Sequence, residues 1–343
     1  MLLLVSEPPA PRRVAIRPRP EVRRRVDYAA ELNREQLEAV MHPGGPMLVL
    51  AGAGSGKTRT LVYRVARLLE DGVKPSQVLL LTFTNRAARE MLDRVGRLLG
   101  RDASRVMGGT FHSVGNRLLR RWGEQLGYRS SYGILDREDA RDLMGAALAE
   151  VVPSAPPRRL PGAAALVEIY SLCINTGRAV DEIVPSRYPQ FASDTDTIAE
   201  VFRRYLERKR AGNVMDYDDL LLNWLLLLRR HEEIRRTLQA RFSHLLVDEY
   251  QDTNRLQADI VDTMLPPRPQ PRGGGRRRPV DLRLPGRRVR QHPLLPRTVP
   301  RLHHVSAGNQ LPLVAPHPGA GQRFHRPQPA TVSQEPASHP RGR

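Results

Sequence analysis

The sequence predicts an α/β fold in which helices flank a parallel sheet, and three features of residues 32–265 carry that prediction. Short apolar runs, at Met47–Leu50 and Val78–Leu81, have the length of buried strands. Apolar residues at helical spacing follow, as in Leu61–Leu69. A third short run, Leu245–Val247, is expected to return to the same sheet. Strands that alternate with helices in this way are typical of parallel sheets, whose strands are joined by crossover helices.

The elements follow one another in a clear order. The first thirty residues are rich in Pro and Arg, show no apolar period and are expected to form a flexible, solvated leader rather than a DNA-binding arm. The strand 47–50 runs into a glycine-rich turn, and the helix after it ends at Gly72. The strand 78–81 leads to a helix at 86–99, which a glycine ends. Residues 116–213 are expected to be mostly helical, with breaks at prolines.

The character of the chain changes after Leu265. Sixteen of the thirty prolines and six of the ten histidines lie in the last 78 residues. That stretch also carries fifteen arginines against two acidic residues, so it supplies +13 of the formal net charge of +19. No helical or strand period is visible in it. Residues 266–343 are therefore predicted to be a disordered, basic tail.

The composition of the chain indicates its cellular compartment and the kinds of partner that it can bind. The single cysteine, Cys173, rules out an internal disulfide and favours a reducing, cytoplasmic compartment. The apolar run Leu220–Leu228 is interrupted by Asn223 and is too short to span a bilayer, so no membrane partner is expected. The basic charge suits a polyanion such as nucleic acid, although charge alone does not define a site.

A phosphate-binding loop is predicted between the first strand and the helix that follows it. It consists of Ala51, Gly52, Ala53, Gly54, Ser55, Gly56, Lys57 and Thr58. Glycines allow backbone N–H groups to approach phosphates, and the helix N-terminus adds favourable electrostatics. Lys57 is expected to reach the β- and γ-phosphates, and the Thr58 hydroxyl to hold Mg²⁺. The strict pattern has Gly at the position of Ala51, and the alternative is a glycine turn without a ligand.

A pair of carboxylates, Asp248 and Glu249, directly follows the third apolar run. A carboxylate at the C-terminal end of a buried strand, beside a phosphate loop, is where Mg²⁺ finds a ligand. We expect Asp248 to bind Mg²⁺, directly or through water, and Glu249 to polarise the attacking water. Taken alone, such a pair is more often a helix N-terminal cap, but the phosphate loop upstream favours the metal role.

Six short motifs occur in order along the chain. They are Leu32–Gln36 (LNREQ), Ala51–Thr58 (AGAGSGKT), Leu81–Ala88 (LTFTNRAA), Gly109–Ser113 (GTFHS), Asp216–Leu220 (DYDDL) and Val247–Thr253 (VDEYQDT). In order and spacing they resemble the early motifs of UvrD/Rep/PcrA-type superfamily 1 DNA helicases. The resemblance implies an ATP-driven motor that tracks along single-stranded DNA, with ATP and Mg²⁺ as cofactors. It also implies a RecA-like P-loop motor domain at 31–115 and 214–265, with 116–213 as a helical insertion domain.

The resemblance implies roles for single residues as well. Gln36 resembles the glutamine that recognises the edge of adenine. The implied DNA contacts are Phe83, Thr84 and Asn85 in one loop and Thr110, Phe111 and His112 in another. Phe83 would stack on a base, and His112 would lie near a phosphate. The alternatives are core packing for Phe83 and Phe111 and a structural role for His112.

Motifs that the family carries after these six are missing from the chain as it stands, but a one-base shift of the reading frame restores two of them. This stretch consists largely of Arg, Pro, Gly and Leu, and each of these residues has codons whose first two bases are nearly fixed. Two of the three bases in every shifted codon are therefore nearly determined by the residues of the tail. One allowed reading across Gln270–Arg287 is NLVVVGDDAQSIYAFRG, and one across Val299–Pro316 is YPDCTTYRLETNYRSSP. We therefore interpret residues 266–343 as the product of a frame slip near Pro266, with a basic charge that carries no evolved chemistry.

The expected function is that of an ATP-dependent DNA helicase whose chain is truncated and catalytically incomplete. It would bind ATP·Mg²⁺ without unwinding DNA, because hydrolysis needs charged groups from a second motor domain. One alternative is a non-catalytic nucleic-acid-binding fragment, whose DNA affinity would not depend on Lys57 and would fall steeply with salt. Another is the ATPase part of a helicase–nuclease, which would need a nuclease motif that this chain lacks.

Overall fold

The computed structural model describes residues 2–6, 25–52, 54–100, 103–152, 160–265 and 303–307. Most of the predicted leader and tail, and Ala53 of the phosphate loop, lie outside these residues. The structure differs from the prediction at two short strands, β1 (Leu2–Ser6) in the leader and β8 (His303–Ala307) in the tail. β1 contains a short apolar run, Leu2–Val5, which was not assigned to a strand because it lies within the Pro- and Arg-rich leader, and β8 contains no such run.

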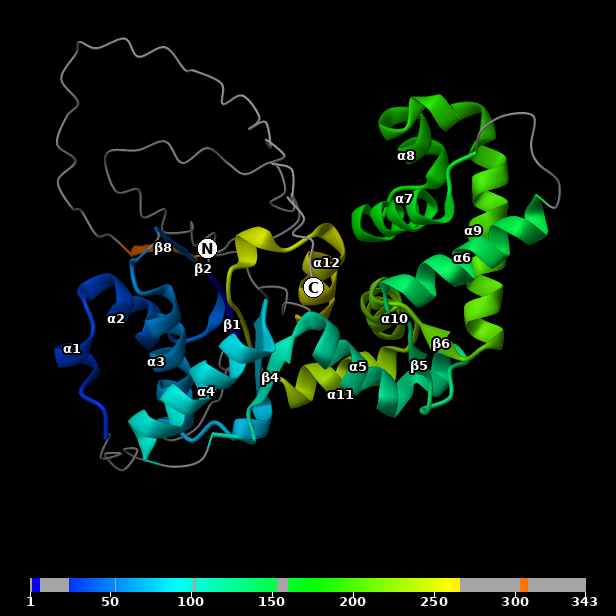
Figure 1. Ribbon diagram of the computed structural model, residues 1–343. Helices are drawn as coiled ribbons and strands as arrows, with labels where there is room; N and C mark the ends of the chain where they lie inside the picture. Colours follow the sequence, from blue (N-terminus) through cyan, green and yellow to red (C-terminus); the bar gives the residue numbers. More distant parts are fainter. Residues whose placement is uncertain are drawn as a thin grey trace, which may run out of the picture. The chain divides into compact units, whose positions relative to one another are not determined.

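A six-stranded sheet in the order β4-β3-β7-β1-β2-β8 lies at the centre of the α/β part (Figure 1). Besides β1 and β8, its strands are β2 (Gly45–Ala51), β3 (Val78–Thr82), β4 (Met107–Thr110) and β7 (His244–Val247). β3 pairs in parallel with β4 and β7, and β2 pairs in parallel with β8. β1 lies between β7 and β2 and runs antiparallel to both. The predicted parallel sheet is therefore present, with one reversed strand inserted in it.

Alternate residues of each strand enter two different cores. In β2, Met47 and Val49 pack in one core and Leu48 in the other. In β3, Leu80 and Leu79 divide between the two cores in the same way. This pattern is expected of a sheet that helices cover on both faces.

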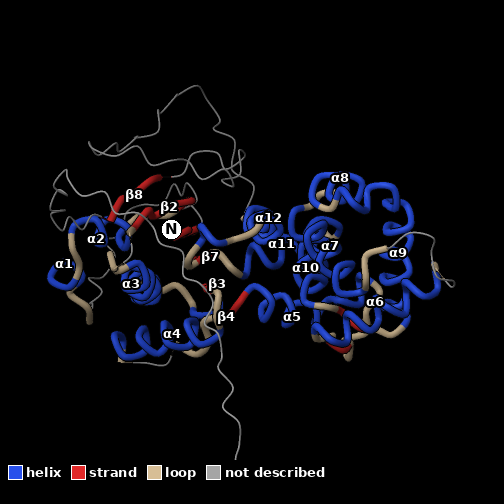
Figure 2. Tube along the Cα trace, turned by 45° about the horizontal axis from the view of Figure 1, so that its top comes forward, coloured by secondary structure: helices blue, strands red, loops and turns tan. Residues whose placement is uncertain are grey.

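Two groups of helices cover these faces (Figure 2). On one face lie α2 (Arg34–Met41), α3 (Lys57–Glu70) and α4 (Asn85–Leu99), and the short α1 (Tyr28–Glu31) precedes them. On the other lie α5 (Phe111–Trp122), α10 (Tyr217–Arg230), α11 (Glu232–Arg241) and α12 (Arg255–Met264). The 3₁₀ turns are η1 (Pro75–Gln77), η2 (Gly123–Leu126), η3 (Pro189–Asp194) and η4 (Tyr250–Asp252).

Four further helices share a core of their own: α6 (Arg137–Val151), α7 (Ala163–Thr176), α8 (Val180–Arg187) and α9 (Thr195–Ala211). The short strands β5 (Gly133–Ile134) and β6 (Val214–Met215) pair in parallel on either side of them in the sequence. The boundary predicted at residue 116 falls inside α5, which packs against α10. The helical part therefore begins after α5.

The apolar run Leu220–Leu228 forms most of α10, whose side chains are buried in two of the cores. Among the described helices, none combines the length and the hydrophobicity that crossing a bilayer requires.

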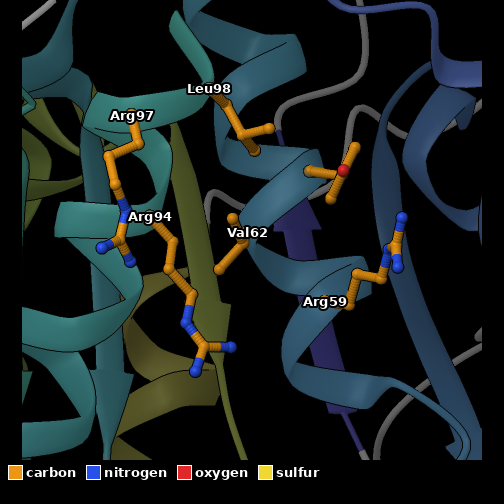
Figure 3. Close-up of a pocket in the computed structure, with 6 residues that line it drawn as sticks. Arg59, Val62, Arg94, Arg97 and Leu98 are labelled. Carbon is orange, nitrogen blue, oxygen red and sulfur yellow. The ribbon is translucent and has the colours of Figure 1, made fainter. Parts of the chain in front are cut away.

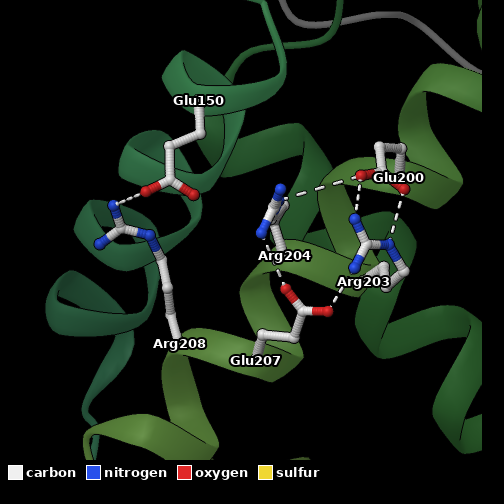
Figure 4. A network of polar contacts seen from close by, with 6 residues as sticks. All are labelled: Glu150, Glu200, Arg203, Arg204, Glu207 and Arg208. Carbon is white, nitrogen blue, oxygen red and sulfur yellow. Dashed lines mark hydrogen bonds and ion pairs between the residues drawn. The ribbon is translucent and has the colours of Figure 1, made fainter.

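Ion pairs line the exposed sides of α6 and α9 (Figure 4). They join Glu150 to Arg208, Glu200 to Arg203 and Arg204, and Glu207 to Arg203 and Arg204. Their side chains are 37–50% exposed, so water and salt screen the charges. Such surface pairs contribute little to stability.

Lys209 of α9 makes a very different ion pair, because its side chain is fully buried. Its Nζ lies 2.7 Å from Oδ2 of Asp216 and 2.6 Å from Oδ2 of Asp219. Asp216 is the N-cap of α10, and the Tyr205 hydroxyl donates to its Oδ2 at 2.9 Å. Burial raises the pKa of Asp219, while the charge of Lys209 opposes that shift. The cluster therefore fixes the end of α9 to the first turn of α10.

Candidate nucleotide and DNA site

The predicted phosphate loop joins the end of β2 to the start of α3. Gly54 and Gly56 have φ angles of +75° and +82°, which glycine adopts without strain. A Cβ on Gly56 would lie 2.5 Å from Nε2 of Gln36, so a side chain there would clash. The Ser55 hydroxyl closes the turn by donating to the carbonyl of Gly52 at 2.7 Å. Gly56 supplies no side chain to cap α3, so N–H groups of its first turn stay available for an anion.

Gln36, the predicted adenine contact, lies against this loop and is 8% exposed. Its Nε2 donates to the carbonyl of Ser55 at 2.9 Å, and its Oε1 accepts from the backbone of Asn33 at 3.3 Å. A primary amide has two N–H donors and two acceptor lone pairs. One donor and one acceptor therefore remain for a base edge, and the position of the amide is fixed by the loop itself.

The side chain of Lys57 reaches the acidic end of β7. Its Nζ lies 3.1 Å from Oε2 of Glu249, although 192 residues separate the two in the sequence. β1 is antiparallel to both β2 and β7, so those two strands point the same way and end at the same edge of the sheet. The structure thus brings the phosphate loop and the acidic pair together.

The two carboxylates of the pair differ in their surroundings. Asp248 is 7% exposed, and burial raises its pKa, as does the charge of Glu249. Burial also raises the pKa of Glu249, but hydrogen bonds from Gln251 and Lys57 outweigh that effect and lower it. Glu249 has a φ of +49°, which a residue with a side chain adopts only under strain. The side chain of Glu249 is therefore anchored at the end of β7 by Lys57 and Gln251.

The predicted magnesium ligands are Thr58, in the first turn of α3, and Asp248. Within the described residues, no three His, Cys, Asp or Glu side chains gather into a cage for a metal ion. Mg²⁺ needs no such cage when it binds a nucleotide, because phosphate oxygens and water supply most of its ligands. One hydroxyl and one carboxylate are oxygen donors of the kind that Mg²⁺ prefers, so the residues present fit the ion.

The two predicted DNA loops follow β3 and β4, which are neighbours in the sheet. Phe83, directly after β3, is 44% exposed. The side chain of Asn85 accepts a hydrogen bond from the backbone of Thr110 at 3.2 Å and so ties the loops together. Thr84 and Thr110 cap α4 and α5, so their hydroxyls already accept hydrogen bonds from these helices. Phe83 is the exposed aromatic side chain of this group, and its ring is available to stack on a base.

Phe111, which was predicted to contact DNA, has a buried side chain. Its side chain is 3% exposed and packs in the core against Trp224, with ring centroids 6.3 Å apart. α5 begins at this residue, and its first turn directs the ring towards α10. The core-packing alternative therefore holds for Phe111, although not for Phe83.

His112 lies beside an exposed aromatic residue that sequence reasoning missed. Its ring meets that of Tyr217 edge to face, with centroids 5.8 Å apart, and Tyr217 is 55% exposed. Burial lowers the pKa of His112, and the charge of Asp218 opposes the shift. In the sequence, only the position of Tyr217 within the motif Asp216–Leu220 could have indicated a functional role. A single tyrosine at the start of a helix belongs to no apolar pattern that would distinguish it.

A cavity of about 440 Å³ lies between α3 and α4 (Figure 3). It is lined by Arg59, Val62, Tyr63, Arg94, Arg97 and Leu98. Arg59 is held by Glu31 at 2.9 Å and lies over the ring of Tyr63. No residue predicted to bind nucleotide or DNA lines this cavity, so the candidate site is the edge of the sheet where β2, β3 and β7 end.

Comparison with known proteins gives one family and a consistent set of relatives. The UvrD/REP helicase N-terminal domain matches residues 32–270. The ATP-dependent DNA helicase PcrA of Leuconostoc citreum is 36% identical over 240 residues, which are 68% of this chain and 31% of the relative. UvrD1 of Mycobacterium leprae (strain TN) is 38% identical over 240 residues, 67% of this chain and 30% of the relative. PcrA of Staphylococcus aureus is 36% identical over 237 residues. The match thus covers 30–31% of the length of these relatives.

Proposed function

Since the chain belongs to the UvrD/REP helicase family, we propose that it binds ATP·Mg²⁺ at the end of its sheet and single-stranded DNA at the neighbouring loops. The observation that carries the proposal is the contact of Lys57 Nζ with Glu249 Oε2 at 3.1 Å. It joins the start of the phosphate-loop helix to the acid that follows the buried strand. Relatives of this chain are named ATP-dependent DNA helicases, so the family is one of enzymes that use ATP.

The residues of the loop each have a part in holding the nucleotide. The N–H groups at the start of α3 bind phosphate oxygens, and Lys57 exchanges its contact with Glu249 for the β- and γ-phosphates. Glu249, released from Lys57, is then free to accept a proton from the attacking water. Gln36 offers its remaining donor and acceptor to the adenine edge.

Thr58 and Asp248 would hold the Mg²⁺ of the nucleotide. When bound, the ion neutralises charge on the phosphates. The sheet fixes the backbone of Asp248, because Asp248 N donates to the carbonyl of Leu81 at 2.9 Å, and this supports the proposed role of its buried carboxylate. Thr58 lies one residue from Lys57, so the same helix turn presents both the cationic and the hydroxyl group.

We further propose that the chain is catalytically incomplete. In P-loop motors the transition state is stabilised by charges from both sides, and loss of a trans-acting arginine costs about 10³–10⁵ in rate. The resemblance implies that the motifs with those arginines follow the six motifs present here, and residues 266–343 do not carry them in their present frame. We therefore expect the chain to bind nucleotide but not to unwind DNA.

Single-stranded DNA binding is tested by removing the exposed ring next to β3. Replacing Phe83 by alanine is expected to weaken binding of an oligo-dT by about 1–3 kcal/mol, because stacking on one base is worth that much. The dissociation constant, measured by fluorescence anisotropy at one fixed salt concentration, should therefore rise by roughly 5- to 150-fold.

Ile134 gives a matched control, because it is 37% exposed on β5 and has no proposed contact with DNA. Replacing Ile134 by alanine should leave the affinity within about 2-fold of the parent chain. An unchanged affinity after Phe83→Ala would remove this loop from the DNA site. Binding that vanished with moderate salt and was equal in both variants would favour a purely electrostatic fragment.

A further inference from the structure

A single side chain of the helical part contacts two segments that adjoin the candidate site. Asn175, in the last turn of α7, accepts a hydrogen bond at its Oδ1 from Nδ2 of Asn254 at 2.7 Å. Its own Nδ2 donates to Oδ1 of Asp218, also at 2.7 Å. α7 belongs to the helical core, whereas Asn254 and Asp218 lie at the starts of α12 and α10. Asn175 is therefore a bridge between two elements of the α/β part.

One end of the bridge is attached to the nucleotide side. Asn254 caps α12 and comes directly after the segment 248–253, which begins with the acidic pair. That segment is short and internally bonded, because Gln251 contacts the Glu249 carboxylate and the Thr253 hydroxyl donates to the Tyr250 carbonyl at 2.7 Å. Hydrogen bonds and a short length of backbone therefore connect Glu249 to Asn254.

The other end is attached to the DNA side. Asp218 lies in the first turn of α10, next to Tyr217, whose ring meets that of His112. The charge of Asp218 also acts on His112, since it opposes the effect of burial on that histidine. Asp218 is therefore next in sequence to one member of the His112–Tyr217 pair and acts electrostatically on the other.

Asparagine suits this place because its amide carries a donor and an acceptor on one rigid plane. Asn175 Nδ2 is also within 2.9 Å of the Ser171 carbonyl and 3.2 Å of the Ser171 hydroxyl, one turn earlier in α7. The contact with Asp218 is the shortest of the three, and its acceptor is a carboxylate, which makes such bonds stronger. The bridge is thus the preferred arrangement of the amide, with Ser171 as a local support.

We propose that Asn175 is a positioning residue that couples nucleotide binding at the end of β7 to DNA binding beside His112, an inference that rests on the proposed function. When a nucleotide draws Lys57 away from Glu249, segment 248–253 loses one of its anchors. The bridge then transmits the change to Asp218 and α10. Coupling of this kind is reciprocal, so DNA must alter nucleotide affinity by the same factor.

The coupling is measured as a ratio of two dissociation constants in the full chain. A fluorescent, slowly hydrolysed ATP analogue is titrated with Mg²⁺ present, with and without a saturating oligo-dT. The parent chain should show a ratio of roughly 5-fold or more. Asn175→Ala should bring the ratio to within about 2-fold of unity while each separate affinity stays within about 2-fold of the parent value.

Two further variants distinguish positioning from a general structural role. Asn175→Asp keeps the acceptor for Asn254 but repels Asp218, so it should behave like Asn175→Ala. Ser171→Ala removes only the supporting hydroxyl and should keep the parent ratio. If Asn175→Ala left the ratio unchanged, or weakened both ligands alike, the coupling role would be refuted. A parent chain that bound both ligands with a ratio of one would refute it too, while the proposed function would stand; a parent chain that bound neither ligand would refute both.

Discussion

Replacing Lys209 by methionine is expected to destabilise the fold by about 3–5 kcal/mol, since it would leave two buried carboxylates without a counter-charge. Asp216 and Asp219 have side-chain exposures of only 11% and 3%. Methionine has an unbranched side chain of similar length but no charge, so the loss arises from the ion pairs and from the contacts of Lys209 Nζ with the rings of Tyr170 and Tyr205. Urea unfolding followed by circular dichroism measures the change.

The surface of the same helix supplies the control. Arg203 makes two ion pairs on α9 but is half exposed, so Arg203→Met should leave the midpoint of unfolding nearly unchanged. A triple variant, Lys209→Met with Asp216→Asn and Asp219→Asn, should recover part of the lost stability, because no buried charge then remains unpaired. Equal midpoints for Lys209→Met and Arg203→Met would show that the buried cluster does not hold α9 to α10.

Restoring the reading frame from Pro266 onwards is expected to raise DNA-stimulated ATP hydrolysis by at least about 10³-fold over the present chain. The restored stretch would carry the two family motifs read in the shifted frame, GDDAQSIYAFRG and NYRS, and each offers an arginine to the nucleotide clamp. A steady-state phosphate-release assay, with and without oligo-dT, compares the two proteins. The restored chain carrying Lys57→Ala should stay inactive, which excludes a contaminating ATPase.

The present chain hydrolysing ATP as fast as the restored one would contradict both the frame slip and the proposed incompleteness. Sequencing of the gene around the codon for Pro266 gives an independent answer. A clean reading frame there, together with an ordered structure for residues 266–343, would make the slip untenable.

The sheet itself offers a reason to expect a missing strand. The connection from β2 through α3 to β3 crosses the sheet in one direction, with its helix on one face. The connection from β4 through α5 to β7 crosses it in the other direction, with its helix on the opposite face. Both connections therefore have the same hand. α12 packs on the same face of the sheet as α5. A parallel strand that followed α12 through a connection of the same hand would lie next to β7, on the side where β1 now lies. β1 occupies this place in the reverse direction. The apolar reading Asn-Leu-Val-Val-Val in the shifted frame is a suitable strand for it.

Local patterns predicted the parts of the protein that depend on neighbours in the sequence. The apolar runs at β2, β3 and β7 and the helix stop at Gly100 were all visible, because strand burial and glycine caps leave short-range signals. The contact of Lys57 with Glu249 could be anticipated only because both stand at the ends of parallel strands.

Features that depend on three-dimensional contacts were not predictable in the same way. Nothing near Phe111 in the sequence indicates that its ring meets Trp224, more than a hundred residues later. The strand β1 lies in a Pro- and Arg-rich leader and is defined by its two partners rather than by a period. The hydrogen bonds of Asn175 to Asp218 and Asn254 likewise join three separate helices.

The central claim is that the loop at Lys57 and the acids after β7 hold one magnesium nucleotide between them. Calorimetric titration of a non-hydrolysable Mg²⁺·ATP analogue into the parent chain and Lys57→Ala tests it most directly, with the exposed Lys74→Ala as the control. Loss of a charged hydrogen-bond donor to the phosphates should weaken binding by about 10- to 100-fold in Lys57→Ala and not in Lys74→Ala. Equal affinity in all three proteins would contradict the account.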